Sequence, residues 1–303
     1  MNEKICRLKQ EKDVVILAHY YVDGAVQEIA DFVGDSYALA ELAAETKHKN
    51  ILFAGVSFMG ESAKLLNPDK HVYMADLTAG CPMADMVTAE QVRTIRKKYP
   101  DAAVVCYVNS SAEVKAESDI CVTSSNAVKV VKKLTQNQIY FIPDSHLARF
   151  VAKQAPEKEF IYHNGYCPTH RSIERNLLLE AKQKYPNAPV LAHPECAEDV
   201  LELADYVGST TEIIRFAKES PAKEYIIATE TGVFYQLEKE NPDKRFYPVI
   251  SPQVCPDMKK VTMEKIANVL ENMGSESCPE VILDTQIMER AARPLEKMLE
   301  MAR

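Results

Sequence analysis

Short apolar runs alternate with longer amphipathic stretches along the whole chain. The runs 14–17, 51–54 and 72–74 consist of aliphatic residues, aromatic residues and Met, and short apolar runs of this kind predict strands buried on both faces. The stretches 36–47 and 61–67 place apolar residues at helical spacing. Strands that alternate with helices predict an α/β fold in which helices cover both faces of parallel sheets.

The opening part of this pattern occurs three times. The segments are "VILAHYYVDGAVQEIADFVGDS", "VVCYVNSSAEVKAESDICVTS" and "PVLAHPECAEDVLELADYVGST", and we align them with His19 opposite Asn109 and His193. An aspartate recurs in each copy, with a hydroxyl residue five positions later. These pairs are Asp31 and Ser36, Asp119 and Ser124, and Asp205 and Thr210.

Each copy also contains a Cys-Pro dipeptide. Cys81, Cys167 and Cys255 lie 86 and 88 residues apart (167 − 81 and 255 − 167). They follow the related segments "NPDKHVYMADLTAGCP", "APEKEFIYHNGYCP" and "NPDKRFYPVISPQVCP". A period shared by several independent features indicates repeated architecture. We therefore expect three units, 1–100, 101–186 and 187–303, the last with a C-terminal helix.

The expected architecture is three pseudo-symmetric three-layer α/β/α units with parallel sheets around a pseudo-threefold axis. Ligands of open parallel sheets bind outside the carboxyl ends of the strands. His19, Asn109, His193 and the three repeated cysteines fall on loops of that kind. If the units pack around one axis, these loops converge on a common centre.

Three convergent thiolates are soft ligands that suit an iron–sulfur cluster or zinc. A [4Fe-4S] cluster held by three cysteines leaves one iron open for substrate. The alternative is an inert set of buried thiols, because cysteine is among the most buried residue types. The remaining cysteines do not share the period, and we expect buried thiols for Cys6, Cys106, Cys121, Cys196 and Cys278.

Polar residues near the expected axis suggest the chemistry. Hydroxyls at Ser36, Ser124 and Thr210 are expected to cap helix N-termini, which are also anion-binding positions. Histidine and glutamate in one cavity can move protons near neutral pH. The candidates for this cavity are His19, Tyr21, Tyr107, Asn109, His170, His193 and Glu195.

Composition excludes several classes of protein. The 303 residues are 47% hydrophobic and 26% charged, with a net charge of −8 and no basic stripe, which argues against a nucleic-acid partner. No apolar run approaches the roughly 18 residues of a membrane span, and "MNEKICRLKQEKD" is too charged for a secretory signal. We expect a soluble cytoplasmic protein with no membrane partner, where a reducing environment keeps thiols available as ligands.

These motifs resemble quinolinate synthase over nearly the whole chain. The resemblance rests on "ILAHYY", "QEIADFVGDS", "GVSFMGESAKLLNP", "CPMAD", "YVNSSAEVKAESD", "TSSNAVKVV", "GYCPTH" and "HPECAEDVLELADYVGST". It implies one [4Fe-4S] cluster on Cys81, Cys167 and Cys255. It also implies condensation of iminoaspartate with dihydroxyacetone phosphate to quinolinate, with release of phosphate and water, in de novo NAD biosynthesis. An aspartate-oxidising enzyme that supplies iminoaspartate is an implied partner.

The resemblance also implies roles for individual residues. Catalytic positions would be His19, Tyr21, His170, His193 and Glu195. Substrate-binding positions would be His19, Ser36, Tyr107, Asn109, Ser124, His193, Glu195 and Thr210. Two alternatives remain open at this point: an iron–sulfur hydro-lyase acting on a hydroxy acid, and a non-catalytic iron–sulfur or zinc sensor.

Overall fold

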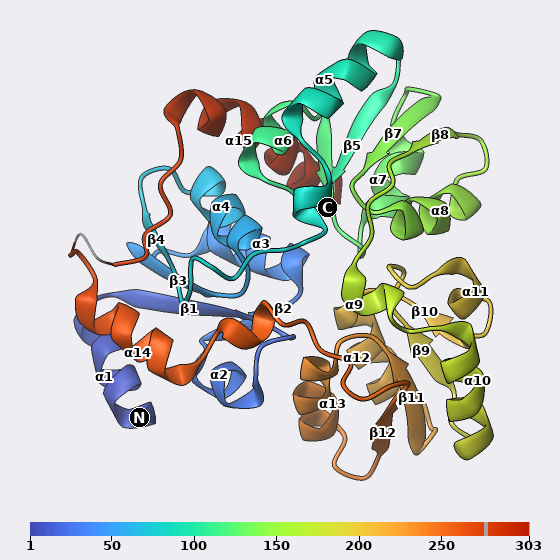
Figure 1. Cartoon of the computed structure of the whole chain (residues 1–303). Coiled ribbons are helices and arrows are strands. Elements are labelled where there is room, and N and C mark those ends of the chain that lie inside the picture. The colour runs from blue at the N-terminus through green and yellow to red at the C-terminus, as the bar shows by residue number, and fades with distance from the viewer. Residues whose placement is uncertain (276–277, 303) are drawn as a thin grey trace.

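The computed structural model describes residues 1–275 and 278–302, and in this part of the chain it contains three four-stranded sheets, all parallel. The strand orders are β2-β1-β3-β4, β6-β5-β7-β8 and β10-β9-β11-β12. Figure 1 shows three lobes, each a sheet with helices on its faces, which meet near the middle of the molecule. The predicted fold of three α/β units with parallel sheets is confirmed.

The first lobe comprises α1 (Asn2–Glu11), β1 (Val14–His19), α2 (Gly24–Ile29), β2 (Phe32–Gly34), α3 (Ser36–Glu45), β3 (Asn50–Ala54), α4 (Ser57–Leu66), β4 (His71–Met74) and the 3₁₀ turn η1 (Ala84–Met86). The second lobe comprises α5 (Ala89–Lys98), β5 (Ala103–Tyr107), α6 (Ala112–Ala116), β6 (Ile120–Val122), α7 (Ala127–Lys133), β7 (Gln138–Ile142), α8 (Ser145–Gln154), β8 (Glu159–Tyr162) and α9 (Pro168–Arg171).

The third lobe comprises α10 (Arg175–Lys184), β9 (Val190–Ala192), α11 (Glu198–Leu201), β10 (Tyr206–Val207), α12 (Thr210–Glu219), β11 (Glu224–Ala228), η2 (Thr231–Val233), α13 (Phe234–Glu240), β12 (Arg245–Pro248) and η3 (Met258–Lys260). The chain ends with α14 (Met263–Asn272) and α15 (Thr285–Ala302).

The central strand of each sheet is tied to the edge strand by the recurring aspartate. The Asp31 carboxylate accepts the backbone N–H of Ile16 at 2.8 Å, and its own N–H donates to the Ile16 carbonyl at 2.9 Å. Asp119 makes the same pair of contacts with Val104, and Asp205 with Val190. This shared two-point contact fixes which residues are equivalent in the three lobes.

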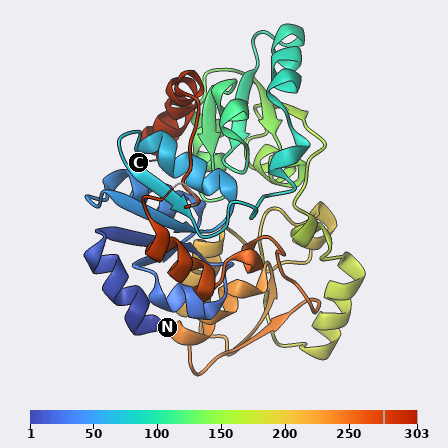
Figure 2. The same ribbon diagram turned by 60° about the vertical axis from the view of Figure 1, so that its left-hand side comes forward.

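The C-terminal segment lies on the first two lobes. Helix α14 contacts α1, and α15 contacts α4 and α6. Between them, the N–H of Met74 donates to the carbonyl of Pro279 at 2.9 Å, so residues near 280 extend the edge of the first sheet. Figure 2 shows both helices against the earlier lobes rather than the third. The unit boundaries at 100/101 and 186/187 stay a prediction.

Candidate functional site at the junction of the three lobes

One pocket lies where the three lobes meet, at the carboxyl ends of β1, β5 and β9. Every residue predicted from the sequence to belong to the site lines it. These residues are His19, Tyr21, Ser36, Cys81, Tyr107, Asn109, Ser124, Cys167, His170, His193, Glu195, Thr210 and Cys255. The expected convergence of loops from all three units is therefore observed.

The structure corrects one alignment between the lobes. Counting back twelve residues from Asp31, Asp119 and Asp205 gives His19, Tyr107 and His193. Asn109, which we placed opposite His19, is equivalent instead to Tyr21 and Glu195. The alignment of Asn109 was wrong by two residues. It matched similar residue types around Asn109 and did not keep the constant distance from the aspartate that the pairing of the central and edge strands requires.

The structure also corrects the predicted helix caps. The N-cap of α3 is Asp35, whose carboxylate accepts the N–H of Ala38 at 3.0 Å, and the N-cap of α12 is Ser209. Ser36 and Thr210 are the first residues inside these helices, while Ser124 lies before α7, which begins at Ala127. All three hydroxyl residues line the pocket instead.

His19 and His193 adopt the same tautomer. The backbone N–H of Tyr21 donates to Nδ1 of His19 at 3.1 Å, and the N–H of Glu195 donates to Nδ1 of His193 at 3.3 Å. Nδ1 is thus an acceptor in both rings, so the proton of each neutral imidazole is on Nε2. In His193 this Nε2–H donates to Ser124 Oγ at 3.2 Å, across the boundary between lobes.

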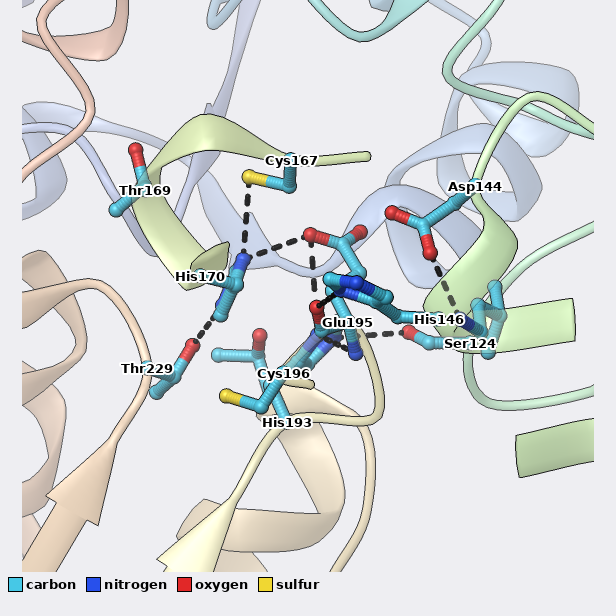
Figure 3. A network of polar contacts seen from close by, with 12 residues as sticks. Ser124, Asp144, His146, Cys167, Thr169, His170, His193, Glu195, Cys196 and Thr229 are labelled. Carbon is cyan, nitrogen blue, oxygen red and sulfur yellow. Dashed lines mark hydrogen bonds and ion pairs between the residues drawn. The ribbon is translucent and has the colours of Figure 1, made fainter. Parts of the chain in front are cut away.

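Glu195 is the acidic centre of the pocket (Figure 3). The Tyr107 hydroxyl donates to Oε1 of Glu195 at 2.6 Å, and Nδ1 of His170 lies 2.7 Å from Oε2. The Glu195 side chain is almost fully buried. Its carboxylate therefore joins a tyrosine and a histidine that both come from the second lobe.

Burial sets the protonation states of these groups. It lowers the pKa of both His19 and His193 to about 3, so both rings are neutral near pH 7. Burial raises the pKa of Tyr21 and Tyr107 well above the usual tyrosine value, which keeps the phenols protonated. Burial opposes ionisation of Glu195, but His170, His193 and the hydrogen bond from Tyr107 together outweigh burial and lower the pKa of Glu195. The Glu195 carboxylate thus lies among several neutral hydrogen-bond donors.

Tyr21 is held between two threonine hydroxyls of the third lobe. Its Oη lies 3.0 Å from Thr210 Oγ1 and 2.8 Å from Thr229 Oγ1. Thr229 was not predicted as a site residue. It immediately follows β11, at the edge of the sheet where ligands are expected, and that position was the available signal.

The three repeated cysteines occupy equivalent positions. Each precedes a proline and a short helical turn, η1, α9 or η3, and its carbonyl accepts the N–H of the residue four positions later. Burial raises the pKa of all three thiols, to about 12 for Cys81. Thiols in this environment need a bound cation to become thiolates.

The spacing of the donors distinguishes a single metal ion from a cluster. Zinc–sulfur bonds of about 2.3 Å hold the sulfur ligands of one ion roughly 4 Å apart. Among the described residues, the group of three donors that lie within 4.8 Å of one another is Cys167, His170 and Glu195, and it excludes Cys81 and Cys255. Cys81 and Cys255 therefore stand outside the compact set of donors that one ion could join, although both line the same pocket as Cys167.

Two buried carboxylates support the cysteine loops of the second and third lobes, and the sequence reasoning missed both. Glu230 Oε1 accepts the backbone N–H of Cys255 at 3.2 Å. Asp144 holds the equivalent position and accepts the N–H of Leu147 at 2.7 Å, while Val56 replaces the acid in the first lobe. Alignment of "GVSF", "PDSH" and "TETG" would have revealed this position.

The other cysteines divide into two groups. Cys106, Cys121 and Cys196 are fully buried, as predicted. The prediction was wrong for Cys6, which is exposed near the start of the chain, and Cys278 is only half-buried. Cys6 projects from the polar side of α1, whose apolar side buries Ile5 and Leu8.

The fold and the site define a three-lobed α/β enzyme with a thiol-lined pocket at the junction of its lobes. The chain belongs to the quinolinate synthetase family: the sequence model described as "Quinolinate synthetase A protein" matches residues 3–300. Membership in this enzyme family rules against the non-catalytic sensor that the sequence left open. In the described residues, no helix combines the length and apolar character that a bilayer crossing requires.

Relatives named quinolinate synthase match this chain from end to end. The one from Fusobacterium nucleatum is 49% identical over 302 residues, covering 100% of this chain and 99% of the relative. Those from Caldicellulosiruptor bescii and Clostridioides difficile are 50% and 47% identical, covering 99% and 100% of this chain and 98% of each relative.

Proposed function

We propose that this protein condenses iminoaspartate with dihydroxyacetone phosphate to give quinolinate, phosphate and two waters in de novo NAD biosynthesis. The convergence of Cys81, Cys167 and Cys255 on the pocket that contains Glu195 and His170 is the observation that supports this most directly. Full-length similarity to relatives named quinolinate synthase supports it independently.

The proposal includes a [4Fe-4S] cluster on the three cysteines. When bound, a cluster with three protein thiolates supplies an open iron that acts as a Lewis acid on a hydroxyl or carbonyl oxygen. The matched positions of the three thiols, one from each lobe and all on one pocket, support a group that three cysteines hold together. A cytoplasmic location is part of the proposal, because a reducing compartment keeps the ligand thiols available.

Anion recognition is assigned to the three hydroxyl positions. Ser36 and Thr210 occupy the first turns of α3 and α12, where backbone N–H groups and the helix dipole favour negative charge. Ser124 holds the equivalent position before α7. Iminoaspartate has two carboxylates and dihydroxyacetone phosphate has one phosphate, so three anion-binding positions suit the pair.

Proton transfer is assigned to the groups around Glu195. Its carboxylate is the candidate base for removing a proton from carbon, with Tyr107 and His170 holding it in place. The Nε2–H groups of His19 and His193 are candidate donors to leaving hydroxyls and substrate oxygens. Tyr21 is assigned to proton transfer or to steering the condensation. Asn109 has a buried Oδ1 without a hydrogen-bond partner among the described residues, which suits a substrate donor.

The small-molecule partners follow from this reaction. Iminoaspartate is the product expected from oxidation of aspartate, so we propose an aspartate-oxidising enzyme as its supplier. A hydro-lyase that acts on a single hydroxy acid is the alternative with similar chemistry. Formation of quinolinate from the two proposed substrates distinguishes them.

The test is anaerobic purification followed by metal analysis, absorption and EPR spectroscopy, and a quinolinate assay. We expect about four irons per chain and quinolinate from the two substrates. Replacement of Cys81, Cys167 or Cys255 by Ser should abolish the cluster equally, whereas the exposed Cys6→Ser serves as the control. A full cluster in any one of the three variants, or no quinolinate from cluster-loaded protein, would contradict the proposal.

A further inference from the structure

Lys115 is a fully buried lysine close to the functional site. It lies on α6, in the second lobe, and is one of the largest fully buried side chains in the described part of the chain. Lysine is almost never fully buried unless its charge has partners. Lys115 lies outside the lining of the pocket, so any effect on the reaction must pass through the residues that it contacts.

The ammonium group of Lys115 holds the loop that carries Asn109. Its Nζ donates to the backbone carbonyl of Ser110 at 2.5 Å. On the other side of Asn109, the N–H of Val108 donates to the carbonyl of Val122 at 2.9 Å, which continues the pairing of β5 with β6. Asn109 therefore lies between two anchored residues, and Lys115 provides the second anchor.

The same lysine faces α4 of the first lobe, which contacts α6 (Figure 1). Nζ of Lys115 lies 5.6 Å from the centre of the Phe58 ring, within the range of a cation–π contact. One turn further along α4, the Glu61 carboxylate accepts the N–H of Ala112, the first residue of α6, at 2.8 Å. Burial raises the pKa of Glu61, and the charge of Lys115 opposes this rise. Lys115 thus joins the Asn109 loop to a helix of the neighbouring lobe.

The other two lobes hold their equivalent loops in a similar way. Tyr21 and Glu195 occupy the positions equivalent to Asn109. The carbonyl of Tyr21 accepts a hydrogen bond from Nζ of Lys259, and the carbonyl of Glu195 accepts one from Nδ1 of His146 at 2.9 Å. Lys259 and His146, like Lys115, lie outside the lining of the pocket. Recurrence of such a contact in all three lobes favours a role in the shared site over local packing.

We propose that Lys115 is a positioning residue that fixes Asn109 for substrate binding. Oδ1 of Asn109 is buried and has no hydrogen-bond partner among the described residues, so its use depends on a fixed backbone. This inference rests on the proposed function, which assigns Asn109 to the substrate. The competing explanation is that Lys115 only satisfies the carbonyl of Ser110 and contributes to stability.

Steady-state kinetics separate the two explanations. Lys115→Met keeps the apolar stem but removes the donor to Ser110. We expect KM for at least one substrate to rise at least about fivefold with kcat within about threefold, because binding is lost while the proton-transfer groups stay in place. Lys158→Met is the matched control, since Lys158 donates to two carbonyls of the same lobe away from the pocket, and both constants should be unchanged. Unchanged KM in folded Lys115→Met would overturn the inference.

A double-mutant cycle tests whether Lys115 acts through Asn109. The variant that combines Lys115→Met with Asn109→Ala should have KM within about twofold of Asn109→Ala alone. Independent effects that multiply would overturn the inference. If Lys115→Met does not fold because Glu61 is left without its cation, the same cycle is measured in a Glu61→Gln background, which removes the unpaired carboxylate.

Hydrogen exchange provides a test that does not depend on turnover. Amide hydrogens of residues 108–111 should exchange at least about tenfold faster in Lys115→Met, with those of α13 in the third lobe unchanged. Exchange as slow as in the wild-type protein would overturn the inference. Failure of the wild-type protein to make quinolinate would instead contradict the proposed function, and hydrogen exchange would still decide whether Lys115 holds the loop.

Discussion

Nζ of Lys259 donates to the backbone carbonyl of Tyr21 at 2.7 Å. Lys259 lies four residues after Cys255, so the loop that presents a thiol in the third lobe also holds the Tyr21 loop of the first. Glu230 connects the two functions, since its carboxylate lies 3.2 Å from Lys259 Nζ and accepts the N–H of Cys255. Gly232 leaves room for this approach: a side chain there would put Cβ 2.6 Å from the Tyr21 carbonyl oxygen.

Removing the lysine charge should destabilise the contact between the first and third lobes. Glu230 is fully buried, so Lys259→Met leaves a carboxylate without its cation, and we expect a loss of about 3 kcal/mol in the free energy of unfolding. Urea unfolding measures it. Lys223→Met, which breaks an exposed pair with Asp243, is the control and should change stability by less than about 1 kcal/mol. Equal effects of the two variants would rule out this role for Lys259.

Loss of the Tyr107 hydroxyl should change how Glu195 ionises. The bond from Tyr107 stabilises the charged carboxylate, so Tyr107→Phe is expected to raise the pKa of Glu195 and shift the acidic limb of the kcat profile to higher pH. We also expect kcat/KM to fall about 10- to 100-fold, the value of one hydrogen bond to a charged group. Tyr185→Phe, in a ring pair with Tyr247, is the control. A profile that does not move would mean that this bond does not control the ionisation.

The two buried imidazoles should make stability depend on pH. His19 and His193 have a folded pKa of about 3 against about 6.5 when unfolded, so unfolding takes up protons between these values. The contribution of the two neutral rings to the free energy of unfolding is full above pH 6.5. Below that pH it falls by about 1.4 kcal/mol per pH unit for each ring. Urea unfolding at pH 7, 6 and 5 measures the slope, and His19→Asn with His193→Asn should reduce it. The same slope in the double variant would refute the assignment.

The sequence predicted the parts of the site that recur with the repeat. Cys81, Cys167 and Cys255 keep one position relative to their strands, and periodicity alone reveals such positions. The alignment of Asn109 was wrong because similar residue types favoured a match two residues away from the correct one. The backbone contacts of Asp119 show which residues of the second lobe are equivalent to those of the other two. Thr229 and Glu230 were missed for another reason. Their partners come from other lobes or distant loops, so their contacts are not visible locally, and only a comparison of the residues that follow the third strand of each sheet could have drawn attention to them.

The recurring aspartates should contribute to stability without affecting catalysis. Asp119 accepts the N–H of Val104 at 2.7 Å and pairs with Arg96 at 2.7 Å, in a half-exposed position away from the pocket residues. A backbone hydrogen bond to a carboxylate that is partly exposed is worth about 1 to 2 kcal/mol, so Asp119→Ala should lower the free energy of unfolding by that amount and leave KM unchanged. Urea unfolding and substrate titration measure the two quantities.

Asp101→Ala, on an exposed turn, is the control, and an Asp119 variant as stable as that control would show that the contact contributes nothing. Because the contact is repeated, we expect similar losses in Asp31→Ala and Asp205→Ala.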